Sequence, residues 1–189
     1  MPITALDART ALVVIDMQRG VVALQTAHPM PGVVDRCALL ARAFRDAGKV
    51  VVLVNVKIRP GIDALKPRAD VQPPARTITP DFFELIPELG ADHERDVLVT
   101  KRQWGAFYGT DLDLQLRRRG ITGIVMCGVA TSIGVESTAR DAYERGYNLS
   151  FASDAMTDMS AESHENSLKR IFPRMGEVGR TDEVVALLK

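Results

Sequence analysis

Residues 10–18 read Thr-Ala-Leu-Val-Val-Ile-Asp-Met-Gln, a short apolar run that ends in an acid, Asp16. A run rich in Val and Ile without alternation is typical of a strand that is buried on both faces. Further runs of this kind follow along the chain. They lie at 50–56, 97–100, 121–130 and 147–152.

Helical patterns separate these runs, and we expect helices at 33–44, 111–119, 133–145, 160–172 and 181–188. Strands that alternate with helices predict a parallel sheet with helices on both faces. The proline-rich segment 57–91 interrupts this rhythm, and a long irregular insertion in a compact domain is usually functional. With 189 residues, the chain is predicted to form one domain over 1–189.

The composition narrows the class of partner. Lys and Arg number 24 and Asp and Glu number 24, so the formal net charge is zero. That balance argues against nucleic acid or an anionic membrane as the main partner, since both attract an excess of basic residues. The apolar runs are too short to span a membrane, and two cysteines fit a reducing compartment. We expect a cytoplasmic protein with a small-molecule ligand.

Polar residues at the strand ends predict the site, because ligands of open parallel sheets bind beyond the carboxyl ends of the strands. Asp16 ends the first strand, and Lys101 follows the third. The two residues form either a structural ion pair or a functional one. Thr131-Ser132 caps the next helix, supplies amides for an oxyanion, or does both. Ser132 has no evident base that would make it a nucleophile.

Cysteine and histidine carry little further chemistry in this sequence. Cys37 lies on an apolar helical stripe and Cys127 in an apolar strand, so both are interpreted as inert core residues. The histidines His28, His93 and His164 are scattered and do not have the spacing of metal ligands. We expect neither a metal nor a cofactor.

Three motifs in this order resemble the isochorismatase-like hydrolase superfamily. They are Leu12 to Gln18, Lys101 with Gly105-Ala-Phe107, and Gly128-Val-Ala-Thr131 with residues 135–142. The stretch 101–120 is similar to the YecD-like branch. The resemblance implies a three-layer α/β/α sandwich with a six-stranded, mostly parallel sheet. It also implies a homo-oligomer.

Most members of this superfamily are cysteine amidohydrolases with an Asp-Lys-Cys triad. The resemblance assigns Asp16 and Lys101 to the first two positions, and Gly134 stands at the position of the cysteine. Glycine has no nucleophilic group, so a thioester route through that position is excluded. The metal-binding Asp-x-His run of nicotinamidases is replaced by Asn55-Val-Lys57.

Isochorismatases proper also keep Asp and Lys with Gly, and they hydrolyse a vinyl ether. By that resemblance Asp16 is the general acid, Lys101 is its charge partner and Gly134 leaves room for the substrate. A cis peptide is expected between Val129 and Ala130. Arg59 is a candidate for binding a substrate carboxylate, and Trp104 and Phe107 are either pocket walls or packing. The expected substrate contacts are Gln18, Arg59, Trp104, Phe107, Val129, Ala130 and Ser132.

Two alternatives remain open at this point. Besides the vinyl-ether hydrolase, the chain could be a catalytically silent protein that binds a small molecule. It could also be an amidohydrolase that uses water directly with Asp16 as the base. Both follow from the same Gly134, and both keep the pocket of the superfamily.

Overall fold

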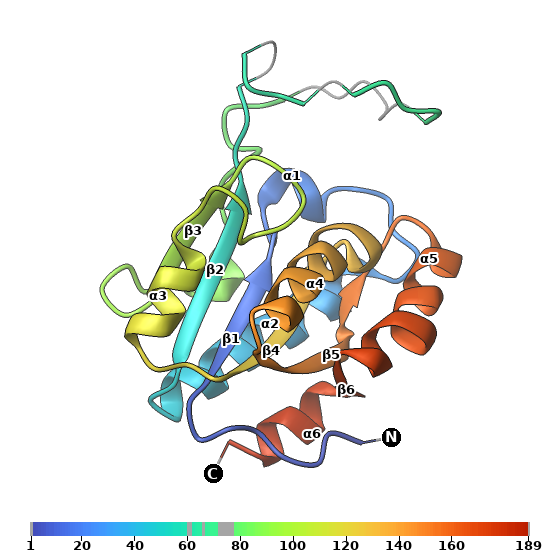
Figure 1. Cartoon of the computed structure of the whole chain (residues 1–189). Helices are drawn as coiled ribbons and strands as arrows, with labels where there is room; N and C mark the ends of the chain where they lie inside the picture. The colour runs from blue at the N-terminus through green and yellow to red at the C-terminus, as the bar shows by residue number, and fades with distance from the viewer. Residues whose placement is uncertain (1, 60–61, 66, 72–77, 189) are drawn as a thin grey trace.

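The computed structural model describes residues 2–59, 62–65, 67–71 and 78–188. In these parts of the chain, six strands form one sheet in the order β3-β2-β1-β4-β5-β6, and every neighbouring pair is parallel. The strands are β1 (Thr10–Ile15), β2 (Val50–Val56), β3 (Val97–Lys101), β4 (Gly123–Val129), β5 (Asn148–Thr157) and β6 (Gly176–Gly179). The predicted α/β fold is confirmed (Figure 1).

Helices cover the sheet on both faces. The α-helices are α1 (Arg19–Val22), α2 (Met30–Asp46), α3 (Leu112–Arg118), α4 (Glu136–Glu144), α5 (Ala161–Asn166) and α6 (Thr181–Ala186). The shorter helical turns are η1 (Pro87–Leu89), η2 (Thr131–Val135), η3 (Ser167–Ile171) and η4 (Phe172–Arg174). The five predicted helices therefore exist, although the last two turns of 160–172 are not regular α-helix.

The two faces of the sheet contribute to two separate cores. Leu12 and Val14 of β1 face α2 and α6, whereas Val13 and Ile15 face α3 and α4. This alternation follows from the two-residue period of a strand, and it makes β1 apolar throughout because both faces are covered. Figure 1 shows α3 and α4 in front of the sheet and α2 behind it.

Three elements differ from the sequence predictions. The sequence patterns identify no strand at 176–179, yet β6 forms there. An added Cβ would lie 2.1 Å from the carbonyl oxygen of Leu149 at Gly176, and 2.0 Å from Oε2 of Glu183 at Gly179. The backbone of β5 therefore requires glycine at 176, whereas at 179 the crowding comes from the side chains of Glu183 and Ile3. The four-residue α1 and the three-residue η1 are also too short to show a period.

The described part of the proline-rich segment lies at the carboxyl end of the sheet. Gln18 forms an antiparallel bridge with Leu85, so residues near 85 are held beside the end of β1. Figure 1 shows residues that follow β2 extending above the sheet. Within the described ranges, no helix is long and apolar enough to cross a membrane.

Candidate active site

Asp16 stands where β1 ends, and its backbone conformation turns the chain away from the sheet. Its φ is 51°, in the left-handed region that Asp tolerates better than most residues do. The amide of Asp16 still donates to the carbonyl of Val54, 3.0 Å away, so the residue stays bound to β2. The strand therefore delivers the carboxylate to the carboxyl edge of the sheet in a fixed direction.

Lys101 is the last residue of β3 and reaches Asp16 across the end of β2. Along β3 the buried residues Val97, Val99 and Lys101 alternate with two exposed ones, so Lys101 shares the buried face. Its Nζ lies 2.8 Å from Oδ2 of Asp16 and also donates to the carbonyl oxygen of Trp104. The Lys101 side chain is 1% exposed and that of Asp16 11%, so solvent screens this ion pair little.

The Asp16 carboxyl has one oxygen without a partner. Oδ1 is enclosed and makes no hydrogen bond, whereas Oδ2 accepts from Lys101. Burial raises the pKa of Asp16 to about 6, and the charge and hydrogen bond of Lys101 counter only part of that rise. Burial, which raises the pKa of Asp16, is therefore a larger effect than the attraction to Lys101, which lowers it. A carboxyl with this pKa exchanges a proton near neutral pH.

Gly134 lies directly beside the Asp16–Lys101 pair. It lies in η2, which follows β4 directly, and a Cβ built on it would be 3.2 Å from Nζ of Lys101 and 3.4 Å from Oδ2 of Asp16. The three residues predicted as catalytic therefore come together. The peptide between Val129 and Ala130 is cis, as expected from the resemblance.

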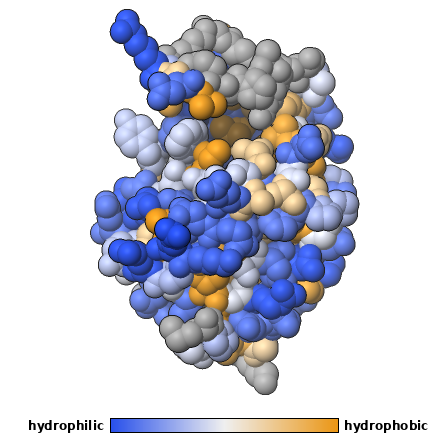
Figure 2. Space-filling view, turned by 90° about the vertical axis from the view of Figure 1, so that its right-hand side faces the viewer, coloured by the Kyte–Doolittle hydropathy of each residue, from blue (hydrophilic) through white to orange (hydrophobic). Residues whose placement is uncertain are grey.

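A cavity of about 310 Å³ opens over these three residues. Its wall is mainly apolar, and Figure 2 shows apolar side chains gathered around a hollow near the upper end of the molecule. Besides the three residues, the lining comprises Val21, Leu24, Val56, Ile58, Ala64, Leu65, Arg102, Gln103, Trp104, Val129, Ala130, Ile133 and Met159.

Three of the seven expected substrate contacts line this cavity, namely Trp104, Val129 and Ala130. Phe107 lies instead in the core, 4% exposed, with its ring 6.1 Å from that of Tyr147. Of the two interpretations left open for Phe107, the structure places it as packing. Arg59 does not line the cavity, and its Nε lies 2.9 Å from Oδ2 of Asp63.

The side chain of Gln18 binds backbone groups at the end of β2 and in the loop near Phe83. Its Oε1 accepts from the amide of Val56 at 2.8 Å, and its Nε2 donates to the carbonyls of Val56 at 3.0 Å and Phe83 at 2.8 Å. The side chain is fully buried and has no free polar atom. It ties the loop near Phe83 to the end of β2, so its effect on the cavity is indirect.

Ser132 points to Asp158 rather than to the cavity. Its amide and its hydroxyl both donate to Oδ2 of Asp158, at 2.7 Å and 2.8 Å. The amide of Ile133 donates to the carbonyl of Ala130. These two amides are therefore not available for an oxyanion. Neither hydroxyl caps the helix: that of Ser132 donates to Asp158, and that of Thr131 donates to the carbonyl of Thr157.

Asp158 is the positioning residue that sequence analysis missed. The fifth strand was predicted to end at 152, with Asp154 as its polar end, but β5 continues to Thr157 past an irregularity in its register with β4. The strand end is therefore Asp158, and Asp154 accepts from Thr181 instead. The apolar residues Ala155 and Met156 are the sequence signal that the strand continues beyond residue 152.

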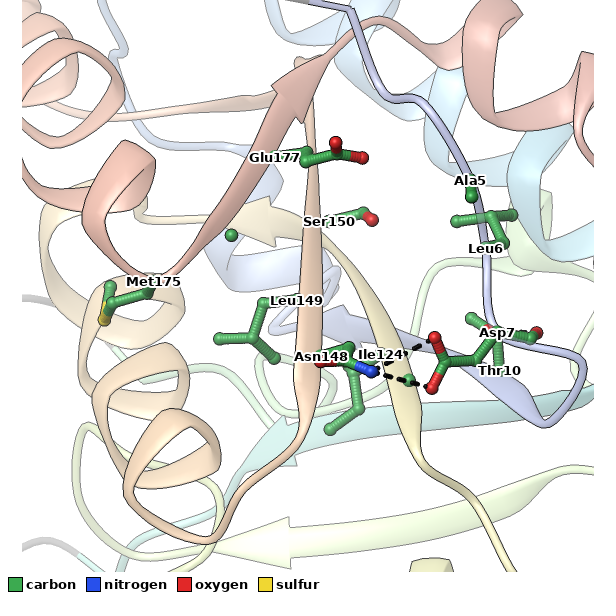
Figure 3. Close-up of a pocket in the computed structure, with 12 residues that line it drawn as sticks. Ala5, Leu6, Asp7, Thr10, Ile124, Asn148, Leu149, Ser150, Met175 and Glu177 are labelled. Carbon is green, nitrogen blue, oxygen red and sulfur yellow. Dashed lines mark hydrogen bonds between the residues drawn. The ribbon is translucent and has the colours of Figure 1, made fainter.

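A second hollow lies at the opposite edge of the sheet, where β4, β5 and β6 begin (Figure 3). Its carboxylates are satisfied: Asp7 accepts from Asn148 and Thr122, and Glu177 accepts from Thr4. With every acid engaged, this hollow offers no reactive group. Among the described residues, no group of three or more His, Cys, Asp or Glu side chains is arranged to hold a metal ion.

The parallel α/β sheet with an Asp-Lys pair at its carboxyl edge is the arrangement that the resemblance to isochorismatase-like hydrolases implied, and the sequence comparison finds the same family. Residues 10–183 match the isochorismatase domain, and the chain belongs to the isochorismatase family.

The chain is 48% identical over 183 residues to the uncharacterized isochorismatase family protein YwoC of Bacillus subtilis, covering 96% of this chain and 95% of that one. It is 47% identical to the uncharacterized family protein YecD of Escherichia coli, covering 95% and 96%. A solved isochorismatase family structure from Burkholderia thailandensis superposes with a TM-score of 0.93 at 46% identity, covering 98% of each chain. The predicted similarity to YecD is thereby confirmed.

Proposed function

We propose that this chain hydrolyses a small vinyl ether, with Asp16 as the general acid and without a covalent intermediate at position 134. The observation that carries the proposal is the enclosed, unpartnered Oδ1 of Asp16 beside a residue that has no side chain. Asp16 lines the cavity, and a proton carried on Oδ1 is not held by any hydrogen-bond acceptor among the described residues. Gly134 stands at the position that the superfamily resemblance gives to a nucleophilic cysteine.

The chemistry needs only a proton, a water molecule and a charge partner. The Asp16 proton passes to the terminal carbon of the vinyl group, whose π electrons form the new C–H bond and leave an oxocarbenium carbon. Water adds its oxygen to that carbon and returns a proton to the Asp16 carboxylate. The resulting hemiketal collapses: the bond between its central carbon and the ether oxygen breaks, and the hydroxyl proton passes to that oxygen. The rest of the substrate leaves as an alcohol, and the central carbon becomes a ketone, which is pyruvate for an enolpyruvyl ether.

Lys101 holds the Asp16 carboxylate after the proton has left. Because Lys101 Nζ binds Oδ2, the proton is carried on Oδ1 and the new negative charge forms next to an ammonium group. A fixed cation at the place where charge develops lowers the barrier in a low-dielectric site. The apolar wall limits competition from bulk water.

The test is pyruvate release from isochorismate by the purified protein. We expect release that Asp16→Asn abolishes and that Asp35→Asn, at an exposed carboxyl on α2, leaves unchanged. Absence of pyruvate, or equal release by the Asp16→Asn variant, would contradict the proposal.

The pH profile separates this proposal from the water-dependent amidohydrolase. An acid must start protonated, so turnover falls as pH rises through the Asp16 pKa of about 6, whereas a base must start ionised and gives the opposite trend. Ammonia release from small amides that rises across that pH would favour the amidohydrolase. Thermal stabilisation by a ligand without any product would favour a silent binding protein.

A further inference from the structure

The charges around the cavity are unevenly distributed between its floor and its mouth. At the floor, the ammonium of Lys101 is paired with the carboxylate of Asp16, and the remaining oxygen of Asp16 is unsatisfied. A ligand carboxylate placed there would face an acceptor that cannot donate unless it is protonated. The floor therefore offers a ligand carboxylate a hydrogen bond from Asp16 only in the protonated form that the proposed reaction uses.

The mouth of the cavity carries an excess of positive charge. Two guanidinium groups, Arg59 and Arg102, lie beside a single carboxylate, Asp63, which leaves one positive charge in excess. Asp63 is committed to Arg59: it accepts from the backbone amide of Arg59 and lies 2.9 Å from Nε of that side chain. Its distance to Nε of Arg102 is 3.7 Å, too long for a hydrogen bond.

Arg102 consequently keeps its donors available. Its side chain is 51% exposed, it lines the cavity, and it donates no hydrogen bond to any residue within the described ranges. The planar guanidinium group matches a carboxylate with two parallel hydrogen bonds. The same cavity wall also includes apolar side chains such as Val56, Ile58 and Ile133.

We propose that Arg102 recognises a carboxylate of the substrate at the cavity mouth, and that the substrate is a small amphiphilic organic acid whose reacting end enters toward Asp16. This assigns to Arg102 the role that the sequence suggested for Arg59. It rests on the proposed function for the direction of the substrate, and it names the substrate class of that same site.

The experiment measures binding alone, so that its outcome is independent of turnover. The probes are meta-fluorobenzoate and meta-fluorobenzamide, which share one ring and differ in charge, observed by fluorine NMR with the purified protein. We expect the benzoate to bind at least tenfold more tightly than the benzamide. Arg102→Gln removes about a tenfold share of that affinity, as a charge-assisted hydrogen bond at a partly exposed site should.

Three further variants make the result specific. Arg118→Gln removes the same charge from the exposed face of α3 and should leave benzoate binding unchanged. Arg102→Lys should restore only part of the affinity, because an ammonium group lacks the planar fork. Asp63→Asn removes the competing carboxylate and should bind benzoate more tightly. Melting temperatures show whether each variant is folded.

Equal benzoate binding by wild type and Arg102→Gln, or equal binding of benzoate and benzamide by wild type, would overturn the inference. If isochorismate is not hydrolysed while benzoate binding still depends on Arg102, the proposed reaction fails and the ligand class stands. If pyruvate is released and Arg102→Gln changes neither binding nor KM, the reaction stands and the inference fails.

Discussion

Gly134 packs directly against the ammonium group of Lys101: a Cβ at position 134 would lie 3.2 Å from Nζ. It would also lie 3.0 Å from Cγ2 of Ile15, so any side chain must displace a neighbour by a few tenths of an ångström. The glycine is therefore part of the surface that holds the Asp16–Lys101 pair in place.

Gly134→Ala should fold and lose activity. The added methyl group shifts Lys101 or Asp16 from its position, and displacements of less than 1 Å near a reacting group can lower turnover by about tenfold or more. Pyruvate release and the melting temperature check this. Gly32→Ala, on helix α2, is the control: it should leave turnover unchanged and stabilise the protein by up to about 1 kcal/mol. Unchanged turnover in Gly134→Ala would contradict the packing argument.

Asp16→Ala and Asp16→Asn should differ in stability while both lose turnover. Alanine leaves the buried ammonium of Lys101 with the carbonyl of Trp104 as its one remaining partner among the described residues, and an uncompensated buried charge costs about 3–5 kcal/mol. Asparagine keeps a hydrogen-bond acceptor and tolerates the positive φ of 51° at this position. Urea unfolding of the two variants measures the difference. Equal stability would show that Lys101 finds another partner or loses its charge.

The pH dependence of stability follows from the raised pKa of Asp16. The folded protein binds this proton more tightly than the unfolded chain, in which the pKa of the Asp side chain is 3.8. The protonated carboxyl therefore stabilises the fold fully below pH 3.8, and this contribution is lost as pH rises through about 6. The shift corresponds to about 3 kcal/mol. Urea unfolding across this range should show the decline in wild type and a smaller one in Asp16→Asn. Parallel curves for the two proteins would refute the assignment to Asp16.

Asp158→Ala should weaken both stability and turnover. The carboxylate of Asp158 is 2% exposed and accepts from the amide and hydroxyl of Ser132 and from the amide of Ser160. Leaving these donors without a partner costs about 1–3 kcal/mol, and the turn that carries Gly134 loses its anchor. Asp182→Ala, whose side chain is 79% exposed, is the matched control. A fall in stability with turnover unchanged would confine Asp158 to a structural role.

The fold was predictable because its strongest signals are local. Short Val-rich runs, glycine at helix ends and polar residues at strand ends are visible without knowing any contact. The same locality explains the failures. Strand β6 begins at Gly176, a glycine that the backbone of β5 requires, and the true end of β5 is hidden by an irregular register with β4.

The site was predictable only where chemistry and strand ends coincide. Asp16 and Lys101 each follow a strand, so their meeting follows from topology. The direction of a side chain beyond a strand end does not follow in this way. Gln18 turns to β2, Phe107 enters the core and Ser132 binds Asp158, whereas Arg102, which no pattern singled out, lines the cavity.

The Asp16–Lys101 pair stands on the sheet, but much of the cavity wall comes from the segment that follows β2. Ile58, Ala64 and Leu65 belong to a loop whose sequence can vary with little effect on the strands below. This part of the wall is thus encoded separately from the Asp16–Lys101 pair and from Arg102, which follows β3. Grafting this loop between relatives should exchange their ligand preferences while the proton-transfer step is retained, which makes the scaffold suited to directed changes of substrate.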